Sequence, residues 1–156
     1  MKLWGGRFEK ETNAMVDAFN ACIGFGSRLY EQDILGSIAH ATMLGEENII
    51  PPEDAKKIVE GLKGILADAR EGKIQWSTEA EDIHMNVETL LIQRIGEAGK
   101  RVHTGRSRND QCVLDARMYA RQSCVETRAL LDELIETLLE IAQNHLHTIM
   151  PGYTHL

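Results

Sequence analysis

The segment from Asn109 to Ile149 contains neither glycine nor proline, and this limits the possible folds of the chain more than any other feature. Glycine and proline are the residues that interrupt helices most strongly, so the whole segment can form one helix. Such a helix would be about 60 Å long at the standard rise per residue. We expect at least one helix longer than about 30 residues within Arg106–Ile149.

A broad apolar stripe covers the second half of this segment. A stripe of this width needs partner helices on more than one side, which is typical of a helical bundle. Its members are Leu130, Leu131, Leu134, Ile135, Leu138, Leu139, Ile141, Ala142, Leu146 and Ile149.

Two shorter helices are predicted nearer the N-terminus. Apolar residues at helical spacing favour a helix from about Ser27 to Leu44, with Gly45 as its stop. Pro51 and Pro52 can open the next helix, because proline is tolerated in a first turn. An apolar stripe follows them, and Gly72 is the predicted stop.

A third helix is predicted from capping-box spacing between Thr78 and Glu81, which places its start just before Glu81. Gly96 is its predicted end. Strictly alternating β-branched runs, typical of strands, are absent from the sequence. The expected fold class is therefore all-α.

The expected organisation has two parts. Residues 1–105 form a small helical N-terminal domain, and residues 106–156 form the first long helix of a central bundle and the start of a further functional loop. Because this polar loop begins just before Leu156, we expect the chain to be a truncated piece of a longer protein.

Composition excludes several function classes. The formal net charge of -7 gives no reason to expect binding to nucleic acid or to an anionic membrane. Neither a transmembrane segment nor the apolar core of a signal peptide is found. The three cysteines are widely spaced and include no Cys-x-x-Cys pair, which argues against disulfides or structural zinc and favours a reducing cytoplasm.

A polar motif of chemical interest precedes the long helix. Residues 103–111 read His-Thr-Gly-Arg-Ser-Arg-Asn-Asp-Gln. Two guanidiniums, hydroxyls and an amide at a helix N-terminus suit the binding of carboxylates or phosphates. The alternative is a solvent-exposed N-cap loop, with Ser107 or Asn109 as the capping residue.

This motif resembles the first signature region of argininosuccinate lyases, within the fumarase/aspartase superfamily. Three further segments resemble family signatures in the same order. They are Leu3–Phe8 (Leu-Trp-Gly-Gly-Arg-Phe), Glu81–His84 (Glu-Asp-Ile-His) and Met150–Leu156 (Met-Pro-Gly-Tyr-Thr-His-Leu). Four ordered matches across nearly the whole chain are far more specific than any one of them.

The resemblance implies cleavage of argininosuccinate to arginine and fumarate by β-elimination, without metal or organic cofactor. Arg108 and Asn109 match substrate-contacting positions of the family, with Ser107 beside them as a further donor. Thr154 matches a substrate contact and His155 a proton-transfer residue. The direction of proton transfer at His155 stays open.

The sequence also departs from the family pattern. Cys22 occupies the place of a substrate-contacting serine, and a thiol is a much weaker hydrogen-bonding group than a hydroxyl. Gly26 stands where an aspartate is common. A third signature loop containing Met-Pro-x-Lys is absent from the 156 residues, so no complete site is expected from this chain alone.

The resemblance further implies a homotetramer, with each active site built from three subunits. The apolar stripe itself leads us to expect dimers or tetramers joined by antiparallel long helices. Two other functions remain open: a non-catalytic, crystallin-like structural relative, and a sister lyase acting on adenylosuccinate. Asp82 and His84 lie at a predicted helix start, and this position favours a structural role for both. His84 would cap the helix or pair with Asp82. We expect His40 to be a hydrogen-bonded residue of the core or of an interface.

Overall fold

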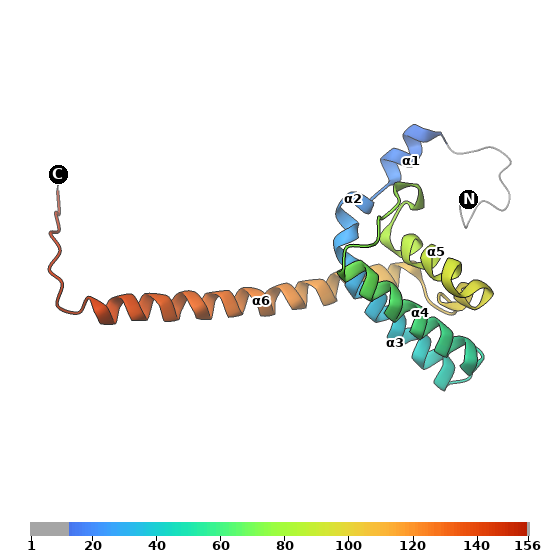
Figure 1. The fold of residues 1–156 in the computed structure, drawn as a ribbon. Coiled ribbons are helices and arrows are strands. Elements are labelled where there is room, and N and C mark those ends of the chain that lie inside the picture. The colour runs from blue at the N-terminus through green and yellow to red at the C-terminus, as the bar shows by residue number, and fades with distance from the viewer. Residues whose placement is uncertain (1–12, 156) are drawn as a thin grey trace. The chain divides into compact units, whose positions relative to one another are not determined.

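The computed structural model describes residues 13–155, and these form helices with no strand (Figure 1). The all-α prediction is confirmed. The elements are α1 (Ala14–Asn20), α2 (Ile23–Gly26), the 3-10 turn η1 (Ser27–Leu29), α3 (Tyr30–Glu46), α4 (Pro52–Arg70), η2 (Thr78–Ala80), α5 (Ile83–Ile95), η3 (Gly96–Arg101) and α6 (Arg108–Asn144). The expected N-terminal signature at Leu3–Phe8 lies outside the described residues.

The chain divides between Tyr119 and Ala120 into two compact units, and this point lies within α6. The first unit contains the apolar core, built from α3, α4, α5 and the turn after α5. Its fully buried side chains include Ile34, Leu44, Ile58, Leu62, Ile65 and Leu91. The domain boundary expected after residue 105 stays a prediction.

Helices α3 and α4 pack against each other with an unusually close approach at one point. A Cβ atom placed on Gly45 would lie 2.5 Å from Cβ of Ala55. Gly45 was predicted to stop the helix, but α3 continues to Glu46. Gly45 is therefore required here for contact with α4 and does not end the helix.

Helix α4 begins at Pro52, as predicted, with Pro51 as the residue before it. Proline fits the first turn because its missing N–H would have no partner within the helix. The helix ends at Arg70, and Gly72 follows with a φ of 69°. Glycine adopts this left-handed conformation without the steric cost that a side chain would add.

The start of α5 differs from the predicted capping box. Thr78 lies in η2, and Asp82 is the N-cap, its carboxylate accepting a hydrogen bond from the Met85 N–H at 2.7 Å. Glu81 has a φ of 62°, which breaks the helical path between Thr78 and α5. The predicted end at Gly96 is confirmed.

Helix α6 is 37 residues long, so the prediction of one continuous helix is confirmed. It ends at Asn144, before the expected limit at Ile149. Within the first unit, Gln111 and Asp115 are buried on this helix. Within the second unit, its large apolar side chains are half or more exposed. Across residues 13–155, no helix combines the length and apolar character required of a membrane span.

We expect Gly45→Ala to lower the free energy of unfolding by about 1–3 kcal/mol, because the added methyl group forces α3 and α4 apart. Urea denaturation followed by circular dichroism measures this. Gly24→Ala is the control, since nothing lies within 4 Å of its new Cβ. Equal stability of the two variants would contradict the close-packing argument.

Candidate active site

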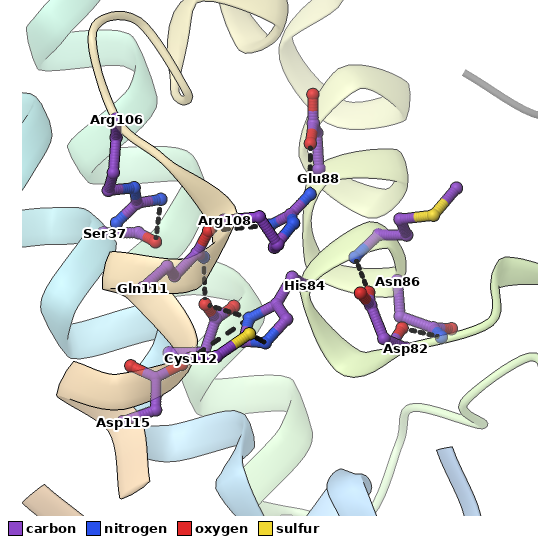
Figure 2. A network of polar contacts seen from close by, with 12 residues as sticks. Ser37, Asp82, His84, Asn86, Glu88, Arg106, Arg108, Gln111, Cys112 and Asp115 are labelled. Carbon is purple, nitrogen blue, oxygen red and sulfur yellow. Dashed lines mark hydrogen bonds and ion pairs between the residues drawn. The ribbon is translucent and has the colours of Figure 1, made fainter. Parts of the chain in front are cut away.

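Buried polar side chains from three helices meet in the first unit (Figure 2). Asp33 comes from α3, His84 from α5, and Gln111 and Asp115 from α6. Their exposed fractions are 1%, 5%, 3% and 0%. Because polar groups at such depth are costly unless they are hydrogen-bonded, their partners determine whether the helices can pack here.

His84 lies between two carboxylates. Its Nδ1 is 2.8 Å from Asp33 Oδ1 and 3.5 Å from Asp115 Oδ2. A carboxylate is an acceptor, so Nδ1 carries the proton and donates to Asp33. In the neutral ring Nε2 is then the acceptor, and Cys112 Sγ lies 3.2 Å from it.

Asp115 is the least satisfied member of this cluster, because neither of its carboxyl oxygens has a hydrogen-bond partner. Burial and the neighbouring negative charge of Asp33 raise the pKa of Asp115 to about 7, although His84 and Arg106 act in the opposite direction. The protonated form of Asp115 is therefore favoured in the folded state at mildly acidic pH.

Gln111 connects this cluster to Arg108. The Gln111 Nε2 amide donates to Asp33 Oδ1, and its Oε1 accepts from Arg108 NH1 at 2.7 Å. Arg108 NH2 lies 3.4 Å from Glu88 Oε2 on α5. The guanidinium at the N-terminus of α6 is therefore held by two acceptors from different helices.

A second guanidinium lies beside the first. Arg106 NH2 donates to Ser37 Oγ at 3.1 Å, and burial lowers the pKa of Arg106. Burial and the two guanidiniums lower the pKa of His103, so its ring is neutral at neutral pH. These residues line a cavity of about 10 Å³, enough for about one water molecule.

Asp33, His84 and Asp115 are also the one group of potential metal ligands found among the described residues, with ligand atoms within 4.8 Å of one another. Two carboxylates and an imidazole could hold a divalent cation. His84 Nδ1 and Asp33 Oδ1 already share a hydrogen bond, so these two atoms have a partner within the protein.

The motif residues Ser107 and Asn109 are exposed, whereas Arg108 is half-buried. Ser107 Oγ accepts a hydrogen bond from the Asn109 N–H at 3.2 Å. An N-cap residue makes this kind of contact at a helix start. Ser107 thus fits the capping alternative, and the Asn109 side chain faces solvent at the N-terminus of α6.

Cys22 also lies in the first unit, where its N–H donates to the carbonyl of Glu81 at 3.0 Å. Burial and the charge of Asp82 raise the pKa of the Cys22 thiol, so the thiol stays protonated. Thr154 and His155 lie in the second unit, in exposed irregular chain beyond α6. The roles of these three residues stay predictions.

The suggested pairing of His84 with Asp82 is wrong. Asp82 caps α5, and His84 turns instead to Asp33 and Asp115. His40 is hydrogen-bonded as expected: its Nε2 lies 2.8 Å from the carbonyl oxygen of Thr104, which ties α3 to the loop before α6.

Sequence reasoning missed the polar residues that surround Arg108. Asp33 with Ser37, and Gln111 with Asp115, are pairs of polar residues four positions apart on their helices. Polar residues four apart share one helix face, so such a pair on a core-facing side signals a buried network. The missed residues are Asp33, Ser37, Glu88 and Asp115, whereas Arg106 and Gln111 belong to the motif at residues 103–111.

Comparison with known proteins gives one consistent result. A family model described as lyase matches residues 6–156. Over all 156 residues, the chain is 60% identical to an argininosuccinate lyase of Desulfitobacterium hafniense, 62% to one of Acetivibrio thermocellus and 59% to one of Lachnospira eligens. The chain spans 34% of the length of each of these relatives.

The raised pKa of Asp115 predicts a pH-dependent stability. Because protonation favours the folded state, the contribution of Asp115 is fully present below its ordinary value near 3.8 and is lost as the pH rises through about 7. Over this window Asp115→Asn should gain stability relative to the parent chain, by up to about 4 kcal/mol.

Denaturant unfolding of both chains between pH 4 and pH 8 measures this difference. Ser37→Ala is the control, since it alters the same buried region without removing a titrating group. A difference between Asp115→Asn and the parent chain that stays constant across the range would rule out the raised pKa.

Proposed function

The chain belongs to the lyase family, and on that premise we propose that the full-length protein cleaves argininosuccinate to arginine and fumarate by β-elimination. The observation that carries this proposal is identity of about 60% over the whole chain to proteins with that activity in their name. The reaction serves arginine biosynthesis in the cytoplasm and uses no metal or organic cofactor.

This reaction requires hydrogen-bond donors that are already in place before the substrate reacts. In such an elimination, a base removes a proton beside a carboxylate of the succinyl group, and negative charge develops on the carboxylate oxygens. Donors fixed in place before the reaction stabilise that charge most strongly. Arg108 supports this role because its guanidinium is held by Gln111 and Glu88 at a helix N-terminus, where the dipole also favours an anion.

The remaining proposed residues act around this guanidinium. Asn109 and Ser107 supply further donors, and Thr154 contacts substrate. His155 transfers a proton, and the direction of this transfer stays open. Cys22 contacts substrate only weakly, because its protonated thiol is a poor hydrogen-bonding group.

The proposed assembly is a homotetramer joined through α6. In the second unit Leu130, Leu134, Leu138 and Leu139 are each more than half exposed in the single chain. Burying a side chain of this size is worth about 1.5–3 kcal/mol. The exposed stripe therefore supports association of copies through this part of the helix.

Replacing Arg108 by alanine in the full-length protein should lower kcat/KM for argininosuccinate by about 100-fold or more, because a charge-stabilising donor is lost. Fumarate production, followed by ultraviolet absorbance, measures the rate. Arg70→Ala is the matched control, since Arg70 pairs with Glu31 on the exposed surface of the first unit. Adenylosuccinate is tested in parallel as substrate.

An active parent whose rate is unchanged by Arg108→Ala would remove Arg108 from the site. A parent that turns over adenylosuccinate in preference would establish the sister activity, and a folded parent inactive on both substrates would favour the structural, crystallin-like role.

Self-association has its own test. The 156-residue chain should form dimers or tetramers at micromolar concentration, as measured by light scattering. Leu134→Glu should shift it towards monomer, whereas Glu136→Gln on the same helix should not. A monomeric parent chain that binds no dye for exposed apolar surface would show that the stripe is covered within one chain.

A further inference from the structure

We propose that Gln111 is a positioning residue that orients the guanidinium of Arg108 towards the substrate carboxylate. This inference rests on the proposed function and extends it to a residue that does not itself touch substrate. It follows from the buried contacts that hold the Gln111 side chain at both ends (Figure 2).

The orientation of the Gln111 amide is set by Asp33. An amide has one donating and one accepting end, whereas a carboxylate oxygen accepts. Asp33 therefore selects the Nε2 end, and Oε1 is left to face Arg108 NH1 at 2.7 Å. Turning the amide over would place oxygen against the carboxylate and NH₂ against the guanidinium, two repulsive contacts at a residue only 3% exposed.

Asp33 is itself fixed by its neighbours. Its Oδ1 accepts from His84 Nδ1 at 2.8 Å as well as from Gln111, and its side chain is 1% exposed. Side chains of α3 and α5 thus set the orientation of the Arg108 guanidinium through Gln111. The contacts that connect them are buried except at the guanidinium itself.

The guanidinium needs this support because Glu88 alone holds it weakly. The contact from Arg108 NH2 to Glu88 is 3.4 Å, longer than a typical charge-assisted hydrogen bond. A second acceptor on the other terminal nitrogen defines the plane of the guanidinium. A fixed plane matters because Arg recognises carboxylates with a rigid fork of N–H groups.

In a purely structural role, Gln111 would only donate a hydrogen bond to the buried carboxylate of Asp33. The two roles predict opposite rankings for two substitutions. Gln111→Glu keeps an acceptor for Arg108 but removes the donor to Asp33 and adds a second acid beside it. Gln111→Met removes both contacts without adding charge.

Steady-state kinetics of the full-length protein with argininosuccinate separate these roles. We expect Gln111→Met to lower kcat/KM by about 10- to 100-fold, the scale expected when a reacting group is slightly misplaced. Gln111→Glu should retain more activity than Gln111→Met. Gln93→Met, an exposed glutamine on α5, is the matched control and should keep the parent rate.

A double-mutant cycle provides the second readout. If Gln111 acts through Arg108, adding Gln111→Met to Arg108→Ala should lower kcat/KM by less than about threefold, far below its effect in the parent. Guanidinium ion in the medium should restore part of the activity of Arg108→Ala, and it should restore less when Gln111→Met is also present. These comparisons require only one folded Gln111 variant.

The outcomes distinguish this inference from the proposed function. A parent without lyase activity overturns the proposed function, and with it the inference. An active parent that loses activity with Arg108→Ala but not with Gln111→Met overturns the positioning role alone. Additive losses in the cycle, or Gln111→Glu falling below Gln111→Met, assign Gln111 to the support of Asp33 and also overturn it.

Discussion

The hydrogen bond between His84 and Asp33 is the contact on which the arrangement of the first unit depends. It joins α5 to α3 between two buried side chains, and it fixes which ring nitrogen carries the proton. Removing one partner would take a hydrogen bond from a buried polar group that water does not readily reach, which costs more than the bond itself contributes. The N-terminal turns of α6 are attached to the same carboxylate through Gln111.

Helices were predictable from this sequence because their signals are local. Periodic apolar residues located α3 and α4, and the absence of glycine and proline located α6. The start of α5 was missed because Thr78 and Glu81 have the spacing of a cap while Glu81 adopts a left-handed backbone. The spacing shows only that the residue types suit a capping box. A cap also requires a particular backbone conformation, which the spacing does not determine.

The candidate site was predictable only in part. The family resemblance pointed to Arg108 and its neighbours as candidate substrate contacts, since a motif is contiguous in sequence. Asp33 lies 78 positions from Gln111, its hydrogen-bond partner. Polar pairs four positions apart indicate a buried polar face on each of the two helices. Nothing in a single sequence says that these two faces meet, so the partners become known only when the helices are placed together.

The close approach of α3 and α4 links two positions that sequence analysis treats separately. Gly45 and Ala55 share a volume too small for two methyl groups at the observed separation. Across relatives with this helix pair, a larger residue at one position therefore requires a smaller one at the other. The two sites should covary in evolution as one packing unit, so that alanine at position 45 is tolerated where glycine stands at position 55.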